Sequence, residues 1–172
     1  MRENIAKNPR GRGRTPTVRQ PCMMTFQQEM HLNDKKTYTP AQINQMAAPF
    51  LPGYLGVAFT RIEGTEIVAQ LPVKPELLAP NGFLHAGSVI SLADTVAGVS
   101  CMINLPEGAN SFTTIELKSN HFGTARQGII EAIGKPVHMG RTTQVWDVVV
   151  TDQGNGKTIA LFRCTQMILY PK

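Results

Sequence analysis

A single acidic side chain, Asp94, interrupts a long apolar run that extends from residue 86 to residue 105. A carboxylate among apolar neighbours is costly unless it is paired, hydrogen-bonded or turned towards a cavity. Burial also raises the pKa of a carboxyl group, which makes the group a useful base near neutral pH. Asp94 could instead be a core carboxylate that bonds a backbone amide or a tyrosine. We favour a functional carboxylate at this position.

The start of the same run offers a complementary group for catalysis. Its small and apolar residues predict a buried helix that begins near Ala86, and the first N–H groups of a helix have no partner within it. Such N–H groups, with the positive end of the helix dipole, stabilise a developing oxyanion, and the Ala86 N–H is the leading candidate. Ala86 and Asp94 are eight positions apart, which is about 12 Å along one helix. One reacting carbonyl therefore meets both groups only if they come from two subunits.

The elements predicted around this helix favour an α+β fold. Thr39 as N-cap and Pro40 at the first helical position predict a short helix that continues to about Phe50 and is stopped by Pro52-Gly53. Alternating apolar residues predict strands over 54–62, 66–73, 112–122, 129–137, 142–152 and 158–169, with a hairpin turn at 63–65 and a loop at 74–84. Because helices and strands do not alternate, we expect a curled antiparallel β-sheet around one long central helix.

Length and charge predict one domain with a basic N-terminal tail. A chain of 172 residues with 42% hydrophobic residues builds one core. Residues 1–22 are nearly free of large apolar side chains, so we expect a disordered basic tail there. The first twenty residues hold six basic side chains and one acidic side chain, and the rest of the chain has eleven of each. The domain predicted over 23–172 is therefore formally neutral, and the high isoelectric point does not indicate a nucleic-acid-binding domain.

The cysteines give no sign of a disulfide framework or a structural metal site. Cys22, Cys101 and Cys164 are odd in number, far apart and without a Cys-x-x-Cys motif or a Cys/His cluster. The N-terminus lacks the apolar stretch of a secretory signal peptide, and polar residues within 86–105 favour a buried helix over a membrane span. We therefore expect a cytoplasmic protein that binds no metal and contacts no membrane.

Three stretches of the sequence contain the residues considered above. They are L-A-P-N-G-F-L-H-A-G-S-V-I-S-L-A-D-T at 78–95, T-T-I-E-L-K-S-N at 113–120 and H-M-G-R-T-T at 138–143. Together they resemble the hotdog-fold acyl-CoA thioesterases, specifically the PaaI-type (phenylacetate-degradation) branch, over about residues 40–170. The resemblance implies a hotdog fold, in which a curled antiparallel β-sheet wraps around one long central helix. It also implies a homodimer with two helices side by side, often doubled to a tetramer.

The resemblance implies catalytic roles for individual residues. The family's His-Gly-Gly, with an acid nine residues after the His, corresponds to His85, Ala86, a glycine and Asp94. Asp94 would be the general base or the nucleophile, the Ala86 N–H would polarise the thioester carbonyl, and Thr114 would help to hold the attacking water. The carbonyl-binding Asn or Gln of better-known relatives is replaced by alanine here, and Asn81 is its candidate substitute. For His85 we favour a structural histidine that bonds the backbone over a second base.

Further residues are candidates for binding the substrate. Arg141, directly after Gly140 in a predicted hairpin turn, matches a position that often contacts coenzyme A phosphates in relatives. Gly87 completes the motif at the helix entrance. Lys118 could assist phosphate binding or be a solvated surface charge. Thr95 could bond the reacting water or its own helix.

These residues together predict an acyl-CoA thioesterase. It would hydrolyse an acyl- or aryl-CoA thioester to the free acid and coenzyme A across a dimer interface, with no cofactor other than the coenzyme A of the substrate. The alternative is a non-catalytic acyl-CoA-binding hotdog protein in which Asp94 is structural. We expect no nucleic acid as a partner. The sequence does not identify the acyl group.

Overall fold

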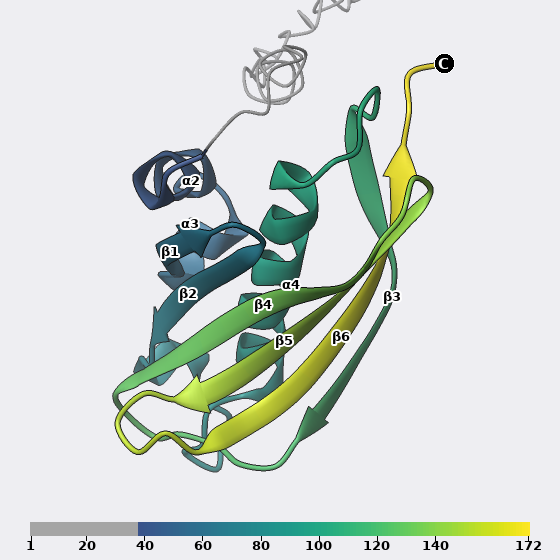
Figure 1. The fold of residues 1–172 in the computed structure, drawn as a ribbon. Coiled ribbons are helices and arrows are strands. Elements are labelled where there is room, and N and C mark those ends of the chain that lie inside the picture. The colour runs from purple at the N-terminus through teal and green to yellow at the C-terminus, as the bar shows by residue number, and fades with distance from the viewer. Residues whose placement is uncertain (1–37) are drawn as a thin grey trace, which may run out of the picture. The chain divides into compact units, whose positions relative to one another are not determined.

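The computed structural model describes residues 38–172 of the chain. The predicted basic tail, residues 1–22, and the first part of the domain predicted from residue 23 lie outside the described residues. Figure 1 shows the described part as one curved β-sheet with the helices on one of its sides. The predicted combination of an antiparallel sheet and one long helix is confirmed.

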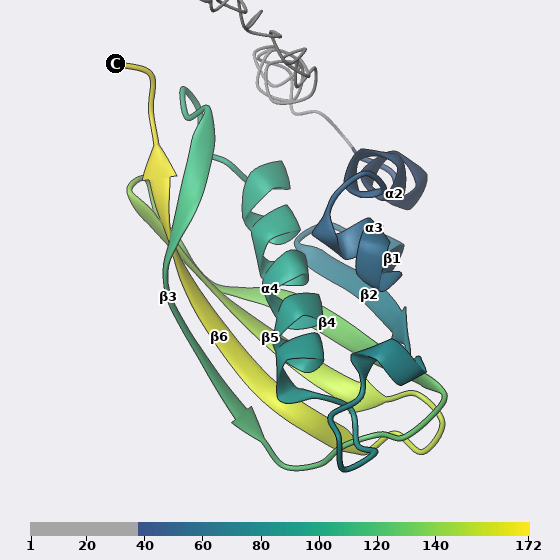
Figure 2. The same cartoon turned by 180° about the vertical axis from the view of Figure 1, so that it is seen from behind.

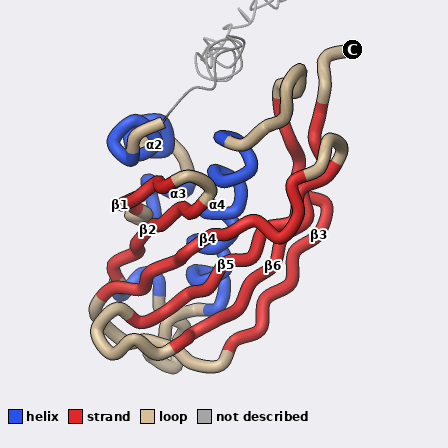
Figure 3. The backbone as a smooth tube through the Cα atoms, viewed as in Figure 1, coloured by secondary structure: helices blue, strands red, loops and turns tan. Residues whose placement is uncertain are grey.

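Six antiparallel strands form the sheet in the order β1-β2-β4-β5-β6-β3, so that β1 and β3 are its edges. Figure 3 shows how the strands run beside one another across the sheet. The predicted strands agree with the observed ones to within about two residues, except at the start of the first strand. The strands are β1 (Ala58–Glu63), β2 (Glu66–Pro72), β3 (Ser111–His121), β4 (Ile129–Met139), β5 (Thr143–Asp152) and β6 (Thr158–Leu169).

The central helix α4 (Ala86–Ile103) lies against the concave side of the sheet, as Figure 2 shows. We call this side of the sheet the inner face and the opposite side the outer face. Seven α4 residues are buried, and the helix approaches β4 closely at Gly134, where a Cβ atom would lie 2.7 Å from Val96 Cγ1. By length and composition α4 could also cross a membrane, but the core helix of a soluble protein passes the same test.

Alternation along the strands explains which side chains build the core. On β5 the residues Gln144, Trp146, Val148 and Val150 are buried, and the residues between them face outwards. Successive side chains of a strand point to opposite faces, so this period of two places one apolar row against α4. The inner faces of the strands and the buried side of α4 form one core cluster.

The region before β1 differs from the sequence prediction. The first helix, α2 (Pro40–Ala47), starts as expected with a capping box at Thr39, but it ends three residues early. A second short helix, α3 (Leu51–Leu55), follows where the start of a strand was predicted. Proline is accepted in the first turn of a helix, so Pro52 lies in the first turn of α3 rather than stopping a helix. Gly56, with φ 89°, ends α3 in the left-handed conformation, and β1 starts only at Ala58.

Candidate active site

Asp94 lies in the middle of α4 and is half-buried. Its carboxylate faces β6, where the Cys164 thiol lies 4.0 Å from Asp94 Oδ1. No cationic side chain within residues 38–172 forms an ion pair with this carboxylate. Burial raises the pKa of Asp94 above its ordinary value, because the ionised form loses hydration without a compensating positive charge. This is the environment expected for a carboxylate that acts as a base.

Thr114 is brought to the same place by β3. Its Cα pairs with that of Gln166 on the inner face, and its Oγ1 lies 4.0 Å from the Cys164 thiol. A β-bulge between Thr114 and Glu116 inserts one extra residue into β3. Glu116 therefore pairs with Thr165 on the outer face, where it accepts a hydrogen bond from the threonine hydroxyl. The bulge keeps this second carboxylate off the face that carries Asp94.

The start of α4 is capped by its own N-cap side chain. The Gly87 N–H donates to His85 Nδ1 at 2.8 Å, so the imidazole bonds the backbone. A Cβ atom on residue 87 would lie 2.9 Å from the same nitrogen, which explains a glycine at that position. Among residues 38–172, no hydrogen-bond acceptor contacts the Ala86 N–H. One donor at the positive end of α4 is therefore available to a ligand.

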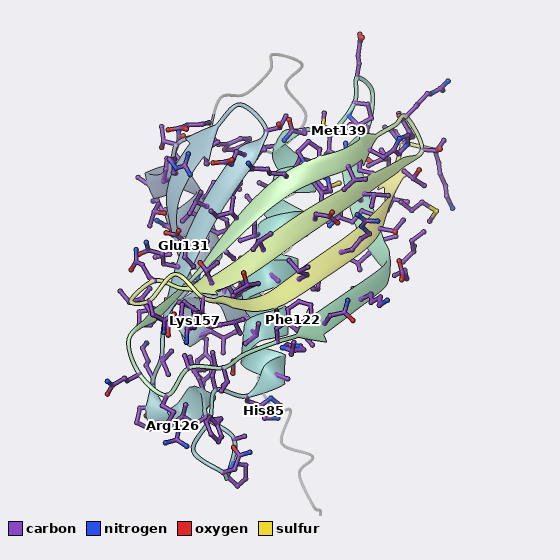
Figure 4. The ribbon with its side chains drawn as sticks, turned by 60° about the horizontal axis from the view of Figure 1, so that its bottom comes forward. His85, Phe122, Arg126, Glu131, Met139 and Lys157 are labelled. Atoms are coloured by element: carbon purple, nitrogen blue, oxygen red, sulfur yellow. The ribbon has the colours of Figure 1, made fainter. Side chains whose placement is uncertain are left out.

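The loop before α4 is held in place by backbone and side-chain contacts. Asn81 Oδ1 accepts a hydrogen bond from the Phe83 N–H at 3.2 Å, so its carbonyl group serves the turn. The Leu84 N–H donates to the Ala125 carbonyl at 2.8 Å, and the Arg126 guanidinium stacks 4.1 Å above the Phe83 ring. These contacts tie the loop to the segment between β3 and β4. Figure 4 labels His85 and Arg126 at this end of the molecule.

Thr95 and Lys118 lie apart from this group. The Thr95 hydroxyl donates to the Ser91 carbonyl at 2.6 Å, so it bonds its own helix. Lys118 is exposed on β3, and its Cα pairs with that of Arg163. Cross-strand partners share a face of the sheet, and Arg163 forms an ion pair with Asp147 on the outer face. Within one chain, Lys118 is thus separated by the sheet from Asp94.

Gly140 and Arg141 form the turn between β4 and β5, at the other end of α4. The Gly140 N–H donates to the Thr143 carbonyl at 2.9 Å, and a Cβ atom on Gly140 would collide with the imidazole of His138. Gln144 Nε2 donates to the carbonyl of Asn104, the C-cap residue of α4. Figure 4 accordingly shows Met139 and His85 far apart. In one chain, the Arg141 turn and the Ala86 N–H are therefore at opposite ends of the helix.

The Cys164 thiol is a member of the site that the sequence did not reveal. The spacing of the three cysteines indicated neither a disulfide framework nor a structural metal site. The alternation of β6 could have placed Cys164 on the inner face, but its contact with Asp94 depends on how α4 crosses the sheet. Sequence spacing does not report that crossing.

A cleft of about 420 Å³ lies on the outer face between β4 and β5, and Asp147 and Val149 are among its lining residues. None of the candidate catalytic residues lines this cleft. No group of three His, Cys, Asp or Glu side chains in the described part of the chain could hold a metal ion.

Comparison with known proteins identifies similar sequences and folds. The sequence profile of the family described as "Thioesterase superfamily" matches residues 81–159. The 1,4-dihydroxy-2-naphthoyl-CoA hydrolase of Escherichia coli is 30% identical over 78% of this chain and 98% of that protein. The proofreading thioesterase EntH of Klebsiella pneumoniae is 30% identical over 69% of this chain and 86% of that protein. A thioesterase structure from Haemophilus influenzae superposes with a TM-score of 0.75 at 27% identity, covering 79% of this chain and 94% of that one.

Proposed function

The chain belongs to the thioesterase superfamily and is a thioester hydrolase, and we propose that it hydrolyses acyl- or aryl-coenzyme A thioesters to a free acid and coenzyme A. Membership confirms the resemblance to hotdog thioesterases that the sequence motifs indicated, and the PaaI protein of Escherichia coli shares the fold at 24% identity. The alternative of a non-catalytic binding protein is not retained, because the relatives are hydrolases. The relatives' substrates, which include a naphthoyl-CoA, support a coenzyme A thioester as the substrate class.

The environment of Asp94 is the observation that carries this proposal. As a general base, Asp94 takes a proton from a water molecule, and the water oxygen attacks the thioester carbonyl. The carbon–sulfur bond then breaks, and the proton on Asp94 passes to the leaving thiolate of coenzyme A. As a nucleophile, Asp94 would itself attack the carbonyl, the carbon–sulfur bond would break with release of the coenzyme A thiolate, and water would hydrolyse the resulting anhydride. In both cases we assign Thr114 to orienting the water, which its contact with the Cys164 thiol beside Asp94 supports, and the Ala86 N–H to stabilising the oxyanion.

The proposed site takes its groups from two subunits. Asp94 is eight residues beyond Ala86 in an unbroken helix, so one carbonyl cannot reach both within one chain. The edge strand β3, with Ile115 and Leu117 more than two-fifths exposed, offers a surface on which a second copy can pair. In a two-fold dimer with antiparallel α4 helices, the Ala86 end of one helix lies beside Asp94, in the middle of the other helix. We assign Arg141, in the turn between β4 and β5, to the coenzyme A phosphates.

We also propose that the protein resides in the cytoplasm. The two described cysteines, Cys101 and Cys164, are free thiols, which agrees with a reducing compartment. Subcellular fractionation of the native cells tests this placement, and recovery of the protein outside the cytoplasmic fraction would contradict it.

A thiol-release assay tests the proposed function. The panel contains short and medium alkyl-CoA, benzoyl-CoA, phenylacetyl-CoA and 1,4-dihydroxy-2-naphthoyl-CoA. The wild-type protein is compared with Asp94→Asn and with Asp147→Asn, a matched change on the outer face. We expect hydrolysis of at least one class, a loss of about a hundredfold or more in Asp94→Asn, and wild-type rates in Asp147→Asn. An Asp94→Asn protein that hydrolyses every substrate at the wild-type rate would remove Asp94 from the mechanism.

A further inference from the structure

The Cys164 thiol contacts both side chains that are proposed to handle the attacking water. Cys164 is fully buried on the inner face of β6, and its Sγ lies 4.0 Å from both Asp94 Oδ1 and Thr114 Oγ1. Within residues 38–172, it is the one side chain that forms a hydrogen bond with the Asp94 carboxylate. The three groups come from α4, β6 and β3 and form a short chain across the core.

The thiol of Cys164 is neutral in this position. Burial, with the neighbouring charge of Asp94 as a second cause, raises the pKa of Cys164 to about 11. A neutral thiol is a poor nucleophile, so Cys164 does not compete with water for the thioester. It is instead a weak hydrogen-bond donor and a polarizable apolar group.

A weak donor at this place has a chemical advantage. A hydroxyl or an amide would stabilise the ionised carboxylate strongly and make Asp94 a poorer base. An aliphatic side chain would fill the space but would give the carboxylate no directional contact. We propose that Cys164 is a positioning residue that holds the Asp94 carboxylate and the Thr114 hydroxyl in fixed positions relative to each other while leaving the carboxylate basic. This inference rests on the proposed hydrolysis of thioesters by Asp94.

The other charged groups near Asp94 face away from it. On β3, Glu116 faces outwards because of the bulge, although its charge contributes to the raised pKa of Cys164. Exposed His121 lies at the far end of β3. Asp152, at the end of β5, accepts hydrogen bonds from the Gly154 N–H and the Asn155 side-chain amide in its own turn, and His138 is exposed near the end of β4. The remaining charged side chains on the strands packed against α4 belong to the outer face, and they are Glu66, Lys118, Glu131, Lys135, Asp147 and Arg163. Cys164 is therefore the titratable group through which a substitution can change Asp94 most directly.

Two substitutions at Cys164 should move the acid limb of the pH profile in opposite directions. Cys164→Ser introduces a stronger donor, so the limb of kcat/KM that reports ionisation of Asp94 should move to lower pH by about half a unit. Cys164→Val removes the donor but keeps an apolar side chain, so the same limb should move to higher pH by about as much. In both variants we expect kcat to fall more than KM rises, because Cys164 is fully buried and acts through Asp94.

Cys101 supplies the matched control. It is also fully buried, on α4, and no hydrogen bond links it to Asp94 among the described residues. Cys101→Ser and Cys101→Val should leave the acid limb in place, whatever they do to thermal stability. The inference is overturned if the Cys164 variants keep the wild-type acid limb, or if the Cys101 variants move it equally.

A measurement on the native Cys164 thiol tests the inference without substituting Cys164 itself. In a Cys22→Ser/Cys101→Ser protein, the infrared S–H stretch reports Cys164 alone. We expect this band to shift as Asp94 titrates, and to stop responding to pH in Asp94→Asn. A band that is the same across the acid limb overturns the inference. Failure of the proposed function is seen separately, since Asp94→Asn would then hydrolyse acyl-CoA at the wild-type rate.

Discussion

Ala86 contributes to the candidate site only through its backbone, so its role is tested by removing the N–H. Proline is well accepted at the first position of a helix, and the extended backbone of His85, with φ −65° and ψ 136°, suits a residue before proline. We expect Ala86→Pro to fold with nearly the wild-type melting temperature and to lose about a hundredfold in kcat. Ala86→Gly keeps the N–H and should retain activity. Equal activity of the proline and glycine variants in the thiol-release assay would contradict an oxyanion role.

The raised pKa of Asp94 also predicts a pH-dependent effect on stability. The folded state binds the Asp94 proton more tightly than the unfolded chain does. The stability from this group is therefore full below the unfolded pKa, near 4, and is lost as the pH rises through the raised folded value. Asparagine does not ionise, so Asp94→Asn should melt a few degrees above wild type at pH 7 to 8. The gain is at most about 1 kcal/mol for a half-buried group.

The test is a series of melting curves from pH 4 to pH 8. The difference between Asp94→Asn and wild type should shrink as the pH falls. A difference that is constant across the series would mean that the carboxyl group titrates alike in the folded and unfolded chains.

At the residue scale, the sequence predicted those candidate site residues that can be recognised from their positions along one helix. Asp94 was found because it is the one charge in an apolar helix, and Ala86 because it starts that helix. Cys164 was missed because its contact with Asp94 joins residues 70 positions apart, through a packing angle that no local pattern encodes. The hydrogen bond that Asn81 Oδ1 accepts within its own turn was also missed. An asparagine that forms an Asx turn and an asparagine that contacts a ligand cannot be distinguished from the sequence.

Close packing between α4 and β4 gives a prediction at the scale of elements. A methyl group on residue 134 would press on Val96 Cγ1 and would lie 3.2 Å from Ser100 Oγ. We expect Gly134→Ala to destabilise the protein by about 1–3 kcal/mol, because overpacking displaces the helix. Val96→Ala removes the obstructing atoms, so the double variant should lose less than the sum of the two single variants. Additive losses in thermal unfolding would show that the two sites are not in contact.

Strands were easier to predict than the short helices. The four long runs after α4 alternate regularly, and their boundaries follow turn residues, so their ends agree closely with β3 to β6. Helix α3 has only five residues, too few for a helical period, and its Pro52-Gly53 is also typical of a turn. The bulge in β3 could not be predicted, because inserting Ile115 changes the pairing partner without changing the local pattern.

At the scale of the whole molecule, a shared site predicts complementation between two inactive variants. In a dimer of one Asp94→Asn chain and one Ala86→Pro chain, one site keeps both functional groups and the other loses both. We expect this heterodimer, purified through two different tags after co-expression, to have about half the wild-type activity. If both groups of a site came from the same chain, every site would carry one defect and the heterodimer would be as inactive as its parents.

The open edge of β3 makes a newly synthesised subunit prone to aggregation. An eleven-residue edge strand with exposed apolar side chains is a template for pairing with any other extended chain. In the proposed dimer a second copy covers this edge, and before that step a newly made subunit can aggregate instead of assembling. Substitutions that weaken the pairing of β3 should therefore appear as insoluble protein rather than as a stable free monomer.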